Sequence, residues 1–352
     1  MSNAPMGVRQ ESPWLAPGWR LLPWMARLPG SALALLVALS ASFVAQSHGG
    51  PTLLYALFFG VAFHFLSHDG RIRQGLDFCA RGVLRLGVGL LGARITAEQI
   101  MGLGWQTAAV VVLAVLSTLL LGTWLGQKMG MSRAQGVLSG GAVAICGASA
   151  ALAISAVLPR ERDSDRSTLM VVVTVTVLST VAMVLYPLLV RALGLPPALG
   201  GLFLGGTIHD VAQVVGAGYT IDQATGDIAT IVKLFRVSML ALVVAVIAAV
   251  FRRERALLAQ DHEAASPGLL PWFLWLFVAL VAINSLGWLP TQAQHTMGDL
   301  SRGCLVLAIG ALGMKTSFAQ LAQAGWRPFA LLLIETLWMA ALVLLCIGLL
   351  RA

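Results

Sequence analysis

Apolar runs separated by short basic segments follow one another through almost the whole chain. The clearly apolar runs are Ser31–Gln46, Thr52–Leu66, Gly82–Ile95, Trp105–Leu125, Thr168–Val190, Thr230–Phe251, Pro271–Leu286, Gly303–Met314 and Phe329–Leu350. A helix needs about 20 mostly apolar residues to cross a bilayer. The pattern therefore predicts an all-α polytopic membrane protein, with a transmembrane domain over residues 31–352 and a polar arm over residues 1–30.

Two further segments, Gly136–Leu158 and Ala198–Tyr219, are rich in glycine, alanine and small polar residues. With a cytoplasmic N-terminus, the arginines of residues 160–166 and 252–255 stay cytoplasmic only if each segment enters and leaves the membrane on one side. Cytoplasmic loops carry the excess of Lys and Arg. We therefore expect nine spans and two re-entrant hairpins, with eleven plain or interrupted spans as the alternative.

An internal repeat indicates a two-fold design. Residues 81–105 align without gaps on residues 302–326, and ten of the 25 positions are identical. The identical pairs include Arg81 with Arg302 and Trp105 with Trp326. Either number of spans places the two copies in opposite orientations. Inverted repeats with discontinuous helices near the middle of the membrane are typical of secondary transporters.

Composition agrees with a membrane protein and bears on which partners and cofactors to expect. Hydrophobic residues make up 58% and charged residues 11% of the chain, whereas soluble domains have about 25% charged residues. The net charge of +8 is spread between apolar runs, so we expect no nucleic-acid partner. The four cysteines form no CxxC pair, and we expect no metal site and no cofactor.

The first glycine-rich segment is a candidate for binding an anion. Glycine lets the backbone approach a ligand closely, and the exposed N–H groups at a broken helix end attract negative charge. The candidate substrate-binding residues are Gly140, Gly141, Gly147 and Ser149. Packing of helices through small residues explains the same composition and stays open as an alternative.

The second glycine-rich segment contains the motif GGTIHDVAQVVGAG. Its candidate residues are Gly205, Gly206, Thr207 and Gln213 for the substrate, and His209 and Asp210 for a coupling ion. Ionisable groups in an apolar stretch are costly and often functional. A satisfied buried His–Asp pair is the structural alternative. A zinc-protease site is excluded, because Gln213 stands where the second histidine of H-E-x-x-H is needed.

Three more charged residues lie inside apolar runs. Lys233 and Arg236 are three residues apart and share one helix face, so the pair is a candidate oxyanion site. The alternative is that both side chains reach out to the lipid headgroups. Glu335 is isolated in its run, and we assign it a candidate role in ion coupling or in pairing with a cation.

Three ordered motifs resemble the YeiH-type family, to which sulfate export is attributed. They are Gly140-Gly141-Ala-Val-Ala-Ile-Cys146-Gly147-Ala-Ser149-Ala, His209-Asp210-Val-Ala-Gln213-Val-Val and Lys233-Leu-Phe-Arg236-Val. The resemblance covers roughly residues 31–350. It implies kinship with the sodium/proton antiporter and bile-acid symporter superfamily, inverted repeats and alternating access. The family motif has Glu where this chain has Asp210, which keeps the carboxylate but shortens its reach.

The sequence therefore predicts a secondary active transporter, not an enzyme, in the cell inner membrane. We expect it to export a small sulfate-like anion, coupled to protons or sodium. The expected partners are this anion, the coupling ion and the lipid bilayer, and a homodimer stays open. One alternative is a cation/proton antiporter in which Asp210 binds the cation. The other is an intramembrane enzyme that uses His209 and Asp210 as acid and base.

Overall fold

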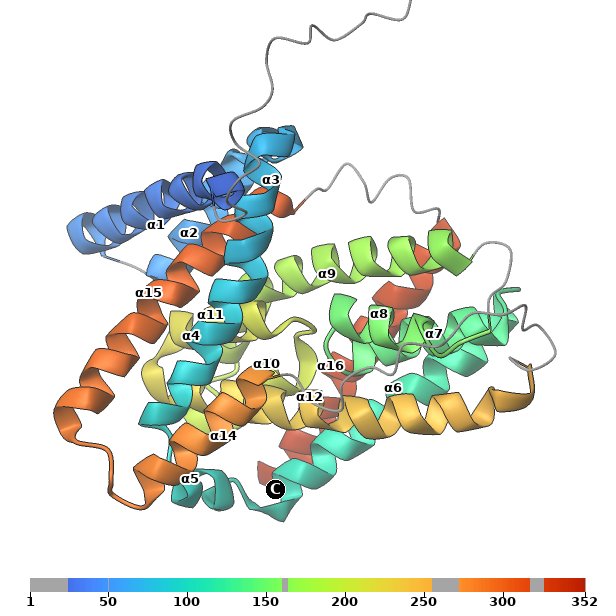
Figure 1. Cartoon of the computed structure of the whole chain (residues 1–352). Coiled ribbons are helices and arrows are strands. Elements are labelled where there is room, and N and C mark those ends of the chain that lie inside the picture. The colour runs from blue at the N-terminus through green and yellow to red at the C-terminus, as the bar shows by residue number, and fades with distance from the viewer. Residues whose placement is uncertain (1–24, 50, 160–163, 255–271, 317–325, 352) are drawn as a thin grey trace, which may run out of the picture.

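The computed structural model describes residues 25–49, 51–159, 164–254, 272–316 and 326–351, so most of the predicted arm over residues 1–30 lies outside it. Within these ranges every regular element is helical. Six helices are long and apolar enough to cross a bilayer. They are α1 (Leu28–His48), α6 (Gly104–Lys128), α9 (Ser164–Ala192), α12 (Gln223–Val250), α15 (Thr291–Lys315) and α16 (Trp326–Arg351), shown in Figure 1. The predicted all-α polytopic membrane fold is confirmed.

Shorter helices complete the bundle. They are η2 (Met25–Arg27), α2 (Thr52–Ala62), η3 (His64–His68), α3 (Gly70–Asp77), η4 (Phe78–Val83), α4 (Leu84–Leu91), η5 (Gly92–Arg94), α5 (Ala97–Gly102) and α14 (Trp272–Ser285). The elements from α3 to η5 follow one another without a gap and together have the length of a span. With α2 and α14 as short apolar helices, this arrangement accommodates the nine predicted spans.

The first glycine-rich segment folds back on itself. It forms α7 (Arg133–Ala144) and α8 (Ala148–Ser155). At the start of α7, the Gln135 side chain donates to Ser167 in the first turn of α9 at 2.9 Å. At the tip, Gly147 lies close to Val175, two turns further along α9. The chain then returns along α7, because Ile154 of α8 lies against Gly141. The segment is therefore a re-entrant hairpin, as predicted.

The second glycine-rich segment forms a matching hairpin against α12. Its helices are α10 (Pro197–Thr207) and α11 (Val211–Ile221). Gly200 near the start of α10 lies close to Thr225, and Gly218 near the end of α11 lies against Gly226. Both outer ends of the hairpin therefore lie beside the first turn of α12. In Figure 1, α7 and α8 lie on one side of the bundle, and α10 and α11 approach from the other.

Local backbone chemistry explains where the two hairpins break. Gly147 has φ +66°, a conformation that glycine adopts without the steric penalty that a Cβ brings, and it precedes α8. In the second hairpin, Asp210 precedes α11 and its carboxylate accepts a hydrogen bond from the Ala212 N–H at 2.8 Å. Asp is among the best residues at this helix-capping position.

Basic side chains gather at the face where α6 ends and α7 begins, which we call the basic face. There the Arg133 side chain lies 3.5 Å from the carboxylate of Glu254, just beyond α12. Arg327 at the start of α16 lies beside Gly130. Because Lys and Arg favour cytoplasmic loops, we expect the basic face to be cytoplasmic. The end of α9 and the start of α12 then lie at the opposite face.

The two copies of the sequence repeat pack against each other in opposite directions. Asp77 just before η4 contacts Lys315 at the end of α15. In the middle, Ser301 donates to the Gly87 carbonyl at 2.6 Å, and Gly298 lies against the Arg94 side chain. Residue numbers therefore rise in one copy as they fall in the other. The predicted inverted orientation is confirmed over the described part of the repeat, which ends at residue 316 in the second copy and resumes at residue 326.

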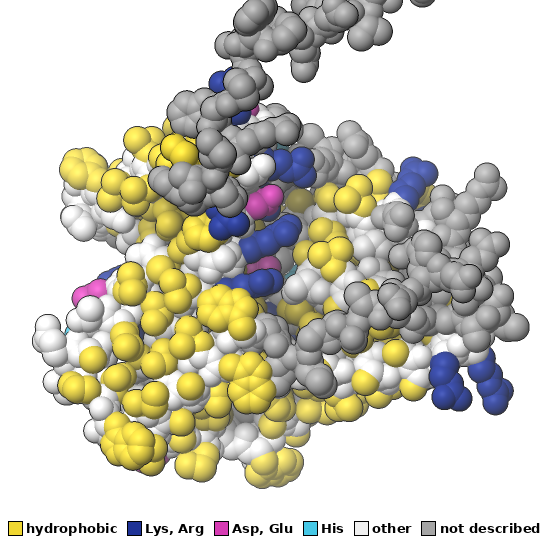
Figure 2. Space-filling model, viewed as in Figure 1, with side chains coloured by type: hydrophobic (Ala, Val, Ile, Leu, Met, Phe, Trp, Pro, Cys, Tyr) yellow, Lys and Arg dark blue, Asp and Glu magenta, His cyan; other side chains and the backbone are white. Residues whose placement is uncertain are grey.

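The surface of the bundle is apolar over a wide area. Large apolar side chains such as Leu36, Trp124 and Leu242 are more than half exposed, and Figure 2 shows apolar side chains covering much of one face. A soluble monomer rarely exposes apolar patches of more than a few hundred Å². Lipid contact explains this surface.

Candidate functional site

Arg236 of α12 lies at the centre of the bundle and joins the two hairpins. Its side chain is fully buried. Nε and Nη2 donate to the carbonyls of Ala144 at 3.0 and 2.7 Å, and Nη2 also donates to Val143 at 3.0 Å. Nη1 donates to the carbonyls of Gly205 and Ile208 at 3.0 and 3.1 Å. Because a helix leaves its last carbonyls unpaired, Arg236 satisfies groups that α7 and α10 expose where they end.

Lys233 lies one turn earlier on α12 and is also fully buried. Its ammonium donates to the carbonyls of Ile145 and Ile208, the latter at 3.0 Å. The C-terminal end of a helix carries partial negative charge, so Lys233 and Arg236 neutralise the ends of α7 and α10. Their burial excludes the alternative that they reach the lipid headgroups. Their predicted role as direct ligands of an oxyanion stays a prediction, since carbonyl groups already occupy both side chains here.

His209 ties the tip of the second hairpin to the first. The imidazole is fully buried, and its Nδ1 lies 3.2 Å from the Val143 carbonyl. A carbonyl only accepts hydrogen bonds, so Nδ1 carries the proton. Nε2 lies 3.0 Å from the hydroxyl of Thr336 on α16. Both ring nitrogens are therefore engaged, and the ring holds α7, α11 and α16 together.

Asp210 lies where the protein interior meets open space. Its side chain is only partly buried, and it lines two neighbouring cavities of about 230 Å³ each. We call these the Arg81 cavities, because both are also lined by Arg81 and by Ala148 at the start of α8. Lys315 lines one and Arg85 the other. Figure 2 shows basic and acidic side chains gathered in a hollow of this face, between apolar surfaces.

The start of α8 faces the Arg81 cavities without a capping side chain. Its N-cap residue is Gly147, which has no side chain to accept the first N–H groups of the helix. Ala148 and Ser149 line the cavity walls. The first N–H groups of a helix have no helical partner and favour anions. The matching end of α11 differs, because there the Asp210 carboxylate occupies this position.

Gln213 and Glu335 are buried with one oxygen each unpaired among the described residues. Gln213 donates to Thr180 of α9 at 2.8 Å, and its Oε1 has no partner. Glu335 of α16 accepts a hydrogen bond from Ser139 at 2.8 Å, and its Oε2 has no partner. Glu335 lies beside α6 and α7 and lines neither of the cavities that Asp210 lines. The structure does not bring these two predicted ion-coupling residues together, and their roles stay predictions.

The other predicted glycines lie at helix contacts. Gly140 lies against the α6 backbone, Gly141 against Ile154, Gly205 against α12 and Gly206 beside Val343 of α16. None of the described cavities is lined by these residues. Close helix packing, the alternative that the sequence left open, accounts for their position. Thr207 donates within its own helix to Phe203 at 2.6 Å.

Sequence reasoning gave no binding role to the basic residues that line the cavities. Arg81 and Lys315 line one of the Arg81 cavities. A separate cavity of about 430 Å³ near the opposite face is lined by Arg94, Arg191 and Arg302, and we call it the Arg302 cavity. The internal repeat held the signal, because Arg81 and Arg302 are its identical charged pair. Their importance depends on where the helices meet, which the alignment alone does not show.

Comparison with known proteins gives consistent relatives. A UPF0324 membrane protein of Chlorobaculum tepidum is 49% identical over 317 residues, covering 90% of this chain and 88% of that protein. UPF0324 membrane protein TauZ of Paracoccus denitrificans is 47% identical over 319 residues, covering 90% and 94%. The family model described as conserved hypothetical protein 698 matches residues 29–332. No solved structure matches. The chain therefore belongs to this family of multi-pass membrane proteins.

Proposed function

We propose that this chain is a secondary active transporter that exports a small oxyanion across the cell inner membrane, with protons or sodium as the coupling ion. The uncapped start of α8 supports this most directly. No side chain caps this helix, and its first residues line the Arg81 cavities, where Arg81 and Arg85 supply positive charge. The protein therefore neutralises the negative, carbonyl ends of its broken helices but not the positive, amide end of α8. Lys233 and Arg236 neutralise the carbonyl ends inside the protein, whereas the α8 amide end faces open space.

The size and polarity of the cavities favour a small substrate. About 230 Å³ is below the roughly 300–1,000 Å³ of pockets for drug-sized ligands. Basic side chains and helix N–H groups stabilise an oxyanion that has lost its water. The resemblance of three motifs to the YeiH-type family supports sulfate as the substrate. Kinship with the sodium/proton antiporter and bile-acid symporter superfamily supports alternating access.

Asp210 is the residue that we propose for ion coupling. Its carboxylate lines the same cavities as the uncapped start of α8 and accepts hydrogen bonds from the backbone N–H groups of Ala212 and Gln213. Loading with a proton or sodium ion lowers its negative charge and thereby lowers its repulsion of an anion in the same space. The anion and the ion therefore favour each other's binding and cross the membrane together. Export follows when the pair keeps a net negative charge, because a membrane potential that is negative inside drives negative charge outward.

One observation favours a second function, that of a cation/proton antiporter. Asp210 is an acid open to the cavity, so a cation could bind its carboxylate directly. Arg81 and Arg85 of the Arg81 cavities oppose this, because they repel a cation, whereas the charge of Lys315 is offset by Asp77. An intramembrane enzyme has less support still, because both His209 ring nitrogens are already hydrogen-bonded inside the protein.

Flux in reconstituted vesicles tests the proposed function. Purified protein in phosphatidylcholine vesicles should accumulate labelled sulfate when a proton or sodium gradient is imposed, and an ionophore that collapses the gradient should abolish accumulation. Protein-free vesicles provide the baseline. Sodium–proton exchange with no anion flux would instead establish the cation antiporter. Absence of flux for sulfate and other small oxyanions would contradict our proposal.

A further inference from the structure

We propose that two anion-binding mouths, built from repeat-related basic residues, flank the hairpin tips on opposite sides. Arg94 and Arg302 form the mouth near the opposite face, and Lys315 and Arg81 form the mouth toward the basic face. The ligand is the free oxyanion itself. One mouth binds the anion before it reaches the start of α8, and the other binds it after it has left. This inference rests on the proposed transport of an anion.

The pairing of these residues follows from the repeat. Residues of the two copies differ by 221 in number, which makes Arg302 the mate of Arg81 and Lys315 the mate of Arg94. The copies pack antiparallel, with Asp77 beside Lys315 at one end and Gly298 beside Arg94 at the other. These two contacts are equivalent, because Gly298 is the mate of Asp77. An antiparallel pair related in this way places mates at opposite ends.

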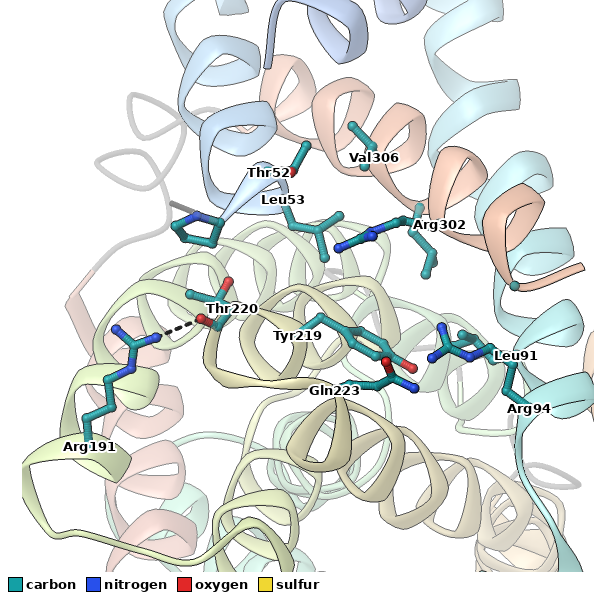
Figure 3. Close-up of a pocket in the computed structure, with 13 residues that line it drawn as sticks. Thr52, Leu53, Leu91, Arg94, Arg191, Tyr219, Thr220, Gln223, Arg302 and Val306 are labelled. Carbon is teal, nitrogen blue, oxygen red and sulfur yellow. Dashed lines mark hydrogen bonds between the residues drawn. The ribbon is translucent and has the colours of Figure 1, made fainter. Parts of the chain in front are cut away.

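The cavities occupy the positions that this symmetry requires. Arg94 and Arg302 line the Arg302 cavity together with Tyr219 and Gln223, near the ends of the second hairpin and the start of α12. Figure 3 shows the Arg94 side chain beside Tyr219 and Gln223, with Arg302 reaching toward the same space from α15. On the other side, Arg81 and Lys315 line a cavity that extends to Asp210. Each mate therefore lines a cavity, and the two cavities lie on different sides of the bundle.

The guanidinium groups of Arg81 and Arg302 are available to bind a ligand. Among the described residues no hydrogen bond or ion pair engages the guanidinium of Arg81 or Arg302, whereas Arg191 in the Arg302 cavity donates to the Thr220 carbonyl at 2.8 Å. Both Arg81 and Arg302 are exposed. Charge in a cleft with low-dielectric walls raises the local concentration of a counter-ion. Two such clefts at the ends of one path give an anion an attractive position on each side.

The two mouths are not identical in charge. Lys315 is paired with Asp77, whereas Arg94 has Gly298 in the equivalent place. The acid nearest in effect to Arg94 is instead Asp227 of α12, which accepts a hydrogen bond from Tyr219 of the same cavity. We expect Gly298→Asp to weaken sulfate binding from the opposite face, because it adds a second carboxylate beside Arg94, at the place that Asp77 occupies beside Lys315. A Cβ at position 298 meets the flexible Arg94 side chain, so the fold can accommodate the change.

Sulfate flux from each side of oriented vesicles tests the two mouths. Arg302→Gln should raise the half-saturating sulfate concentration about tenfold from the opposite face, and leave it within about twofold from the basic face. Arg81→Gln should do the reverse. Arg302→Lys and Arg81→Lys keep the charge and should lie close to wild type, which separates charge from folding. Arg252→Gln at the end of α12 is the matched surface control.

The outcomes separate this inference from the function on which it rests. Wild-type flux with no side-specific change in either glutamine variant overturns the mouths and leaves the transporter proposal standing. Absence of anion flux in the wild type overturns both. Anionic lipid headgroups offer the same chemistry as a free oxyanion, so the vesicles are prepared with and without phosphatidylglycerol. An arginine effect that appears only with the anionic lipid would assign Arg81 and Arg302 to headgroup binding and overturn the mouths.

Discussion

Replacing Arg236 with glutamine should destabilise the whole protein more than any other single change at the centre of the bundle. The guanidinium donates to four backbone carbonyls, from Val143, Ala144, Gly205 and Ile208. Glutamine has two donors and no charge, so most of these carbonyls lose their partner while buried. Removing one side of a buried charged network costs roughly 3–5 kcal/mol. The thermal unfolding midpoint should fall by on the order of 10 °C.

The conservative variant and a control make this result specific. Arg236→Lys keeps the charge but cannot reach both α7 and α10 in the same way, so its unfolding midpoint should lie between those of wild type and Arg236→Gln. Arg253→Gln, on the surface beyond α12, should be close to wild type. The measurement is thermal unfolding in detergent by intrinsic fluorescence. If Arg236→Gln is as stable as wild type but binds sulfate poorly, the guanidinium is an anion ligand and does not chiefly support the hairpins.

The second large effect concerns Asp210. Asparagine has nearly the same shape and is equally good at capping a helix, so Asp210→Asn should preserve α11 while removing the charge. We expect coupled sulfate flux to fall at least tenfold, and the remaining flux to lose its dependence on pH or sodium. Asp210→Glu keeps a carboxylate and should retain the dependence. The measurement is initial sulfate flux over a range of pH and sodium concentrations.

Asp222 offers a close control for this change. It precedes α12 as Asp210 precedes α11, and its carboxylate accepts from the Thr225 N–H at 2.8 Å. It does not line the Arg81 cavities. Asp222→Asn should therefore change flux little. Unchanged pH and sodium dependence in folded Asp210→Asn would restrict Asp210 to a structural cap.

The sequence predicted much of the fold because membrane insertion leaves few options. Apolar length and the positions of arginines indicated the long helices and the choice of hairpins over interrupted spans. The repeat predicted inversion, and the antiparallel contacts of Asp77 with Lys315 and of Gly87 with Ser301 confirm it. The exact residues at which the helices break were harder to predict. They depend on single residues such as Gly147, whose φ of +66° cannot be inferred from a run of glycines.

The sequence predicted which residues belong to the candidate site, but not which groups they contact. Lys233, Arg236 and His209 are central, but nothing in their spacing predicted that they bond to backbone carbonyls of the hairpins. Such carbonyls exist only once the helices have broken and met. The uncapped start of α8 and the cavity beside Arg81 likewise arise from distant segments. Spacing along one chain does not show which helix end faces open space.

The central claim is that a small oxyanion binds at the start of α8, and protection of a thiol at Ser149 tests it most directly. Ser149 is exposed and lines one of the Arg81 cavities. In a chain whose native cysteines are replaced by alanine and that still carries sulfate, Ser149→Cys should react with a membrane-impermeant thiol reagent applied from the basic face. Sulfate should slow this reaction several-fold, while chloride at equal ionic strength should not. Ala156→Cys, beyond the far end of α8, should react equally with and without sulfate. If sulfate leaves the reaction at Ser149→Cys unchanged, the anion does not bind at the start of α8, and the account is contradicted.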